Sequence, residues 1–175
     1  PGRVMRATDF REVYAYSAPG QRDTAWLSDS PGNDRLVATP EYAKIGGVGY
    51  YVRAKGFGCT LAYAKAGGND TAKLKDSPDR DVCVATSEFV RMTGTGYANR
   101  VKFFEQVDVR SRRRSGDSTV LRDAVLTSDS AEIDMDYLRT CVLFHGMEDF
   151  EMRGKSTDNR AEKGIVDRLV AYWLE

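Results

Sequence analysis

Short segments of this chain alternate apolar and polar positions with a period of two. In residues 23–29, Ala25 and Leu27 fall on one side, whereas Thr24, Trp26 and Ser28 fall on the other. The same alternation returns at residues 71–75 and 118–122. A period of two is typical of β-strands that turn one face inward. The pattern therefore predicts short strands, separated by turns rich in Gly, Pro, Ser and Asp.

The alternation recurs because the sequence itself repeats every 47 residues. Residues 2–48 and 49–95 are identical at 20 of 47 positions without a gap, where unrelated sequences of average composition would share about three. A third copy at 96–142 keeps some of the same positions, and we expect a degenerate fourth copy at 143–159. Stacked repeats bury surface between successive copies, so each copy depends on its neighbours. The retained positions of the third copy are Gly96, Arg100, Phe104, Asp117, Leu121 and Asp123.

Small or β-branched residues occupy the inward positions of these strands, as a narrow interior requires. We therefore predict an all-β fold, a right-handed parallel β-solenoid of the β-helix or β-roll kind, over residues 1–159. A helical solenoid fits poorly because no copy carries a long stripe of period 3.6. Residues 160–175 are expected to form a C-terminal capping element, helix or strand, since an open solenoid end exposes a sheet edge.

The charges of the chain cancel, with 26 Lys and Arg against 26 Asp and Glu. A net charge of zero removes the simplest argument for a nucleic-acid partner. Residues 110–114, which read Arg-Ser-Arg-Arg-Arg, are interpreted as a basic loop, since no aromatic residues are interleaved to stack on bases. No apolar run is long enough to span a membrane. We predict neither a nucleic-acid partner nor a membrane span.

Aspartates recur at the turns of the first two copies, and they are the candidate metal ligands. Residues 32–36 resemble a fragment of the glycine-rich nonapeptide whose stacked turns hold Ca²⁺, and Ca²⁺ is the one cofactor considered possible. The alternative is that these carboxylates accept backbone N–H groups within their own turns. The candidate metal ligands are Asp29, Asp34, Asp76 and Asp81.

Two other sets of side chains could form binding surfaces. Arg6, Arg53 and Arg100 repeat with the period and would form a ladder along a solenoid, suited to carboxylated sugars or phosphates or simply solvated. Tyr14, Tyr16, Tyr63 and Trp26 lie on outward strand positions and could form a strip that stacks on sugars, or support the fold.

No residue is predicted to be catalytic or to bind a cofactor. His145 is the single histidine, and no nucleophile elbow, zinc-protease or phosphate-loop motif is present. The three cysteines, Cys59, Cys83 and Cys141, lack metal-ligand spacing. Cys83 takes the repeat position of Leu36 and is therefore predicted to be a small buried residue.

The repeat motif resembles a known type. Residues 23–45 follow the pattern Asp-Thr-Ala-x-Leu-x-Asp-Ser-Pro-Gly-Asn-Asp-x-(Leu/Phe)-Val-Ala-Thr-Pro-x-Tyr-Ala-x-(Leu/Ile), and residues 70–92 follow it with changes. This pattern resembles the tandem repeats of very large bacterial surface or secreted proteins, over about residues 2–123. The resemblance implies an extracellular, adhesive or scaffolding role, often beside calcium-binding repeats, and carries over no catalytic residue.

The sequence therefore favours a non-enzymatic structural or adhesive repeat module, extracellular or on the cell surface. We interpret a chain that begins at Pro1 as the C-terminal part of a larger surface protein. Its expected partners are neighbouring repeats or further copies of itself, and surface polysaccharide. The alternatives are a polysaccharide-binding β-helix, a polysaccharide lyase or hydrolase, and a calcium-stabilised or self-assembling scaffold subunit. In an enzyme, charged residues unique to one copy would share a groove.

Overall fold

The regular elements that the structure describes are β-strands. The computed structural model describes residues 4–18, 22–86 and 89–110 in full, and the backbone of five further strands between 118 and 153. No helix in this part of the chain is long and apolar enough to cross a membrane. The strands described in full are β1 (Glu12–Tyr16), β2 (Thr24–Ser28), β3 (Arg35–Ala38), β4 (Tyr42–Gly47), β5 (Tyr50–Lys55), β6 (Cys59–Tyr63), β7 (Thr71–Lys75), β8 (Val82–Ala85), β9 (Val90–Gly94), β10 (Tyr97–Lys102) and β11 (Gln106–Arg110). The backbone strands are β12 (Ser118–Arg122), β13 (Ala124–Thr127), β14 (Ser130–Met135), β15 (Leu138–His145) and β16 (Asp149–Arg153).

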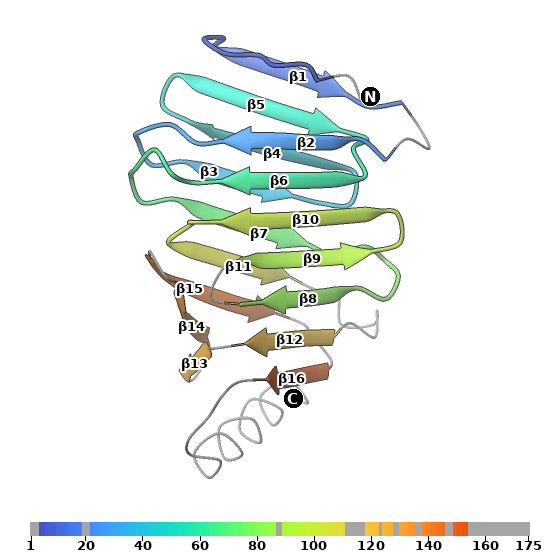
Figure 1. The fold of residues 1–175 in the computed structure, drawn as a ribbon, viewed down its shortest axis with the longest axis vertical. Helices are drawn as coiled ribbons and strands as arrows, with labels where there is room; N and C mark the ends of the chain where they lie inside the picture. The colour runs from blue at the N-terminus through green and yellow to red at the C-terminus, as the bar shows by residue number, and fades with distance from the viewer. Residues whose placement is uncertain are drawn as a thin grey trace.

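These strands form two sheets that lie face to face (Figure 1). The nine-stranded sheet, called the large sheet below, has the order β1-β5-β4-β3-β7-β11-β15-β14-β13. The seven-stranded sheet, called the small sheet, has the order β16-β12-β8-β9-β10-β6-β2. The described strands therefore make a β-sandwich-like arrangement.

The all-β prediction is confirmed, whereas the parallel β-solenoid is wrong. Both sheets are mixed, because each contains antiparallel meanders such as β3-β4-β5 and β8-β9-β10 among its parallel pairs. The hairpins β4-β5 and β9-β10 turn through two residues each, and the second residues, Gly49 and Gly96, have φ of 84° and 79°. Only glycine adopts such angles readily, so it allows the chain to reverse within one sheet instead of coiling onward.

Successive copies of the repeat place equivalent strands in opposite sheets. β1 pairs with β5 in the large sheet at a spacing of 39 residues, and the equivalent β6 pairs with β10 in the small sheet at the same spacing. Likewise, β3 pairs with β7 and β8 with β12 at a spacing of 36 residues, again in opposite sheets. Positions 47 residues apart are therefore equivalent locally but lie in opposite sheets, and only positions two copies apart share a sheet.

The core lies between the sheets and is built from the inward positions that the alternation predicts. Ala25, Leu27 and Leu36 are buried, as are their equivalents Ala72 and Leu74. Cys83 is fully buried, which confirms the prediction, and burial raises the pKa of its thiol to about 12. Both Cys83 and the half-buried Cys59 are free thiols. The expected cap at 160–175 lies outside the described residues.

Candidate functional site

The outer face of the large sheet carries cations and tyrosines side by side. Alternation along each strand and the register between strands put the same rows of positions outward, from β1 to β11. In one such row, Tyr14 is opposite Arg53, Arg53 is opposite Lys44, and Lys73 is opposite Asp108. We call this surface the tyrosine–cation face. Its described members are Glu12, Tyr14, Tyr16, Arg35, Val37, Tyr42, Lys44, Gly46, Tyr51, Arg53, Lys55, Thr71, Lys73, Lys75, Gln106, Asp108 and Arg110.

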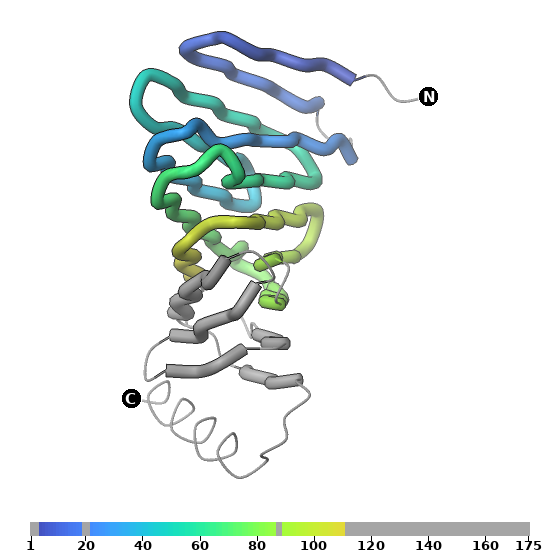
Figure 2. Tube along the Cα trace, turned by 60° about the vertical axis from the view of Figure 1, so that its left-hand side comes forward, coloured from blue at the N-terminus to red at the C-terminus, as the bar shows by residue number. Residues whose placement is uncertain are grey.

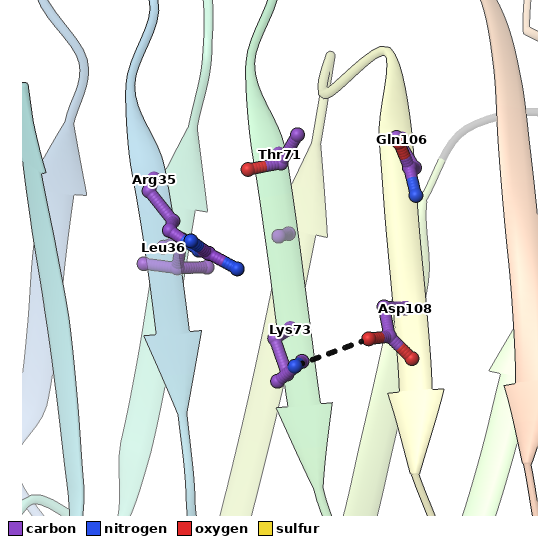
Figure 3. A pocket seen from close by; sticks show the side chains of 7 residues that line it. Arg35, Leu36, Thr71, Lys73, Gln106 and Asp108 are labelled. Carbon is purple, nitrogen blue, oxygen red and sulfur yellow. Dashed lines mark ion pairs between the residues drawn. The ribbon is translucent and has the colours of Figure 1, made fainter.

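A shallow hollow of about 260 Å³ lies over β3, β7 and β11 on this face (Figure 3). Arg35 on β3 points across it toward β7, and Thr71 and Gln106 line one end. Cavities that enclose small-molecule ligands have roughly 300–1,000 Å³. The hollow is smaller than that, so it suits one unit of a chain lying across the strands better than a whole buried ligand.

Asp108 is the one carboxylate in the lining of the hollow, and it is paired. Its Oδ2 lies 3.3 Å from Lys73 Nζ and 3.0 Å from Arg110 Nε. The Arg110 guanidinium also donates to Oδ1 at 3.2 Å. A carboxylate held between two cations is an acceptor for hydroxyl donors, but the described lining holds no second carboxylate to form an acid–base pair with it.

Aromatic rings extend the face toward the strands β1, β5 and β4. The rings of Tyr14 and Tyr51 have their centroids 5.7 Å apart, and the Arg53 guanidinium lies 4.9 Å from the centre of the Tyr42 ring. Tyr14 is 52% exposed, and Tyr16 on the same strand is 69% exposed. These rings offer flat apolar surface with a polar hydroxyl at the tip.

The negative charges of the described chain gather elsewhere, at the turns. Within the fully described ranges, only Glu12 and Asp108 among the acidic residues lie inside strands. The tyrosine–cation face carries seven Lys and Arg against these two carboxylates. In the described part of the chain, cations therefore lie mostly on the strands, and carboxylates lie mostly at the turns.

The predicted metal ligands are mostly bonded to the backbone at these turns. The Asp34 carboxylate accepts the Ser30 N–H at 2.6 Å, and the Asp81 carboxylate accepts the Ser77 N–H at 2.6 Å. Asp29 accepts the Ala66 N–H at 2.7 Å. Asp76 is buried. Among the described residues, no group of three or more His, Cys, Asp or Glu side chains is placed to hold a metal ion. The geometry agrees with the alternative that these aspartates stabilise turns.

A row of carboxylates at the start of β3, β7 and β11 was not predicted from the sequence. Asp70 Oδ1 accepts the Asp34 N–H at 2.8 Å, and Glu105 Oε2 accepts the Asp70 N–H at 2.6 Å. Burial raises the pKa of Asp70 to about 6, and the charges of Glu105, Asp29 and Asp34 add to the effect. Burial likewise raises the pKa of Tyr50, with Asp34 contributing. Asp34, Asp70 and Glu105 are separated by 36 and 35 residues, so the 47-residue repeat does not align them.

The predicted arginine ladder does not form, because alternate copies lie in opposite sheets. Arg53 is on the tyrosine–cation face, whereas Arg100 lies on the outer side of the small sheet, where it donates to the Tyr63 hydroxyl at 2.9 Å. The aromatic strip divides in the same way, with Tyr14 and Tyr16 on the large sheet and Tyr63 and Trp26 on the small one. The side chain of His145 and residues 111–114 of the basic loop lie outside the described part.

Neither a protein-family model, nor a curated protein, nor a solved structure matches this chain. Its function must therefore be argued from its own surfaces.

Proposed function

We propose that this protein is a non-enzymatic adhesive module that binds a carboxylated polysaccharide across the tyrosine–cation face. The observation that supports this function is the composition of the face: seven cations and four tyrosines on one sheet, with two carboxylates. Cations pair with the carboxylates of uronic acids, and rings stack on the apolar sides of sugar units. The resemblance of the repeat to those of bacterial surface proteins supports the same role, in an extracellular or cell-surface setting.

The lining of the hollow favours a sugar chain over a nucleic acid. Thr71, Gln106 and Asp108 can exchange hydrogen bonds with hydroxyl groups, in which sugars are rich. A phosphate backbone gains little from these groups, and Asp108 repels it. The mixed set of cation, amide, hydroxyl and carboxylate therefore matches a polymer that has both hydroxyls and carboxylates.

Binding is favoured over hydrolysis by the same geometry. Charged residues unique to one copy do meet here, since Arg35, Lys73 and Asp108 come from three different copies. Hydrolysis of a glycosidic bond uses two carboxyl groups, but Asp108 is the only one in the lining and is paired with Lys73 and Arg110. The hollow can therefore hold a sugar unit without the pair that cleaves its linkage.

Titration calorimetry with polygalacturonate, neutral dextran and an oligothymidine tests the proposal. We expect polygalacturonate alone to bind, with an affinity that falls as salt is raised, since exposed charges are screened beyond about 10 Å at 0.1 M. Replacing Arg35 and Lys75 by Ala removes two exposed cations. Binding should weaken about fivefold, because each lost ion pair with a ligand carboxylate costs roughly 0.5 kcal/mol.

The matched control replaces Arg91 and Lys102, two cations on the outer side of the small sheet. This double variant should bind polygalacturonate like the unchanged protein. Equal losses in the two double variants would show that the bound surface is not the tyrosine–cation face. Tighter binding of the oligothymidine would favour a nucleic-acid partner instead.

A further inference from the structure

Both sheets have an open edge at the same end of the molecule. β1 is the edge strand of the large sheet and β2 is the edge strand of the small sheet. Figure 2 shows these strands, in blue, at the N-terminal end of the stack. Edge strands expose unpaired backbone N–H and C=O groups that can accept another strand.

The segment before β1 has the conformation of the repeat but lacks its contacts. Asp9 has φ of 63°, as Gly56 and Phe103 at the equivalent positions have 80° and 69°. Phe10, however, is 65% exposed, whereas Phe104, two copies later, is 1% exposed. The turn therefore forms locally, and the burial of the ring that follows it requires a neighbouring copy.

Residues 4–8 are likewise the counterpart of β10, two copies earlier. β10 is paired on both sides, antiparallel to β9 and parallel to β6. Residues 4–8 form no strand, and Val4 and Met5 are 92% and 96% exposed. A strand-forming sequence is thus left without either of the partners that its counterpart has.

The register inside the molecule defines what would pair with this end. β11 and β12 are the counterparts of β1 and β2, two copies later, and they lie in the same two sheets. β11 pairs in parallel with β7, and β12 pairs in parallel with β8. A segment like residues 71–94 would therefore bring one strand to β1, one to β2, and one, like β9, to residues 4–8.

We propose that this end is a docking surface for one further copy of the 47-residue repeat, joined in line and in the parallel register of β7 and β8. The incoming copy would bring inward side chains like Ala72, Leu74 and Met92. At this open end, Val13 and Ala15 on β1 are only half-buried, while their counterparts Val107 and Val109 are fully buried. This inference is independent of the ligand proposed for the tyrosine–cation face.

The test is a fused chain in which a second copy of residues 49–95 is placed directly ahead of Gly2 of the full chain. Hydrogen exchange is measured segment by segment. We expect at least about tenfold slower exchange in residues 4–8, 12–16 and 24–28, because new ladder hydrogen bonds protect their amides. The fused chain should also melt at a higher temperature, since the copy buries Phe10 and covers both edges.

The matched control is the same fusion with Leu74→Asp and Met92→Asp in the added copy only. A buried charge prevents docking, so exchange in the three segments should be as fast as in the unfused chain. Unchanged exchange in the unmodified fusion would overturn the proposal. Protection that instead grows with the concentration of the unfused chain would overturn it in favour of association between whole chains.

Discussion

The Asp34 carboxylate occupies the space that a β-carbon at Gly47 would need. The equivalent pair, Asp81 and Gly94, has the same relationship 47 residues later. Because each aspartate also accepts the N–H of a serine four residues before it, the glycine makes room for a carboxylate that holds the preceding turn. In both copies, the same arrangement of carboxylate and glycine thus joins a turn to the end of a later strand.

Substituting Gly47→Ala should destabilise the protein by about 1–3 kcal/mol, since the added methyl group must displace the Asp34 carboxylate. Urea denaturation measures the change. The control is Gly32→Ala, where the added carbon meets only Ser30 Oγ at 3.9 Å. Equal effects of the two substitutions would contradict this account.

Substituting Asp81→Ala should cost about 1–3 kcal/mol, because it leaves the Ser77 N–H without its acceptor in a buried turn. Asp79→Ala, at an exposed carboxylate two residues away, should stay within about 0.5 kcal/mol. Denaturation of both variants gives the comparison. A small loss for Asp81→Ala would mean that the turn does not depend on this carboxylate.

Calcium should leave the melting temperature unchanged relative to a chelator, because Asp29, Asp34 and Asp81 already accept backbone N–H groups. A ligand that binds only the folded state raises the melting temperature with its concentration. A thermal scan in calcium and in chelator therefore decides the point. A higher melting temperature in calcium would support these aspartates as metal ligands.

Asp70 should make stability depend on pH between its two pKa values. Its pKa is raised from the ordinary 3.8 to about 6 in the folded chain, chiefly by burial. Folding therefore takes up a proton in this interval, and the contribution of Asp70 to stability grows as the pH falls from about 6 towards 4. At pH 8 the Asp70 carboxylate is charged in the folded chain, and the burial of this charge lowers the free energy of unfolding.

The variant Asp70→Asn tests this sign, since an amide oxygen can still accept the Asp34 N–H. We expect the variant to be more stable than the unchanged protein at pH 8, with the difference shrinking towards pH 4. Denaturant midpoints across this range supply the measurement. A difference that does not vary with pH would rule out a raised pKa at Asp70.

Phe104→Ala should cost about 3–5 kcal/mol, as expected for a fully buried aromatic ring. Phe10→Ala, at the same repeat position, should cost less than about 0.5 kcal/mol because the ring is exposed. Chemical denaturation of the two variants compares them directly. Similar costs would mean that Phe10 is packed in solution.

Local features of this protein could be predicted from its sequence because they depend on nearby residues. The period of two placed Ala25 and Leu27 inward, the repeat placed Cys83 at the position of Leu36, and all of these residues are buried. The interpretation of Asp34 and Asp81 as acceptors within their own turns also agrees with their bonds to Ser30 and Ser77. In each case the cause lies within a few residues of the side chain concerned.

The sheet arrangement could not be predicted in the same way. The glycines that reverse the chain, Gly49 and Gly96, were visible in the sequence, but their effect depends on φ angles near 80° and on which strand comes next. They convert a parallel coil into mixed sheets. Because successive copies lie in opposite sheets, Arg53 and Arg100 lie on opposite surfaces, and the period of the sequence is not the period of either surface.

The sequence by itself determined that this protein is a repeat of short strands, which side of each strand faces inward, and how its turns are held. Alternation and turn chemistry act over a few residues, so their effects can be predicted without the tertiary structure. Only the tertiary structure decided which strands become neighbours, with the parallel pairs at spacings of 35 to 39 residues instead of 47. That pairing brings Arg35, Lys73 and Asp108 to one hollow, because strands from three copies lie side by side in one sheet.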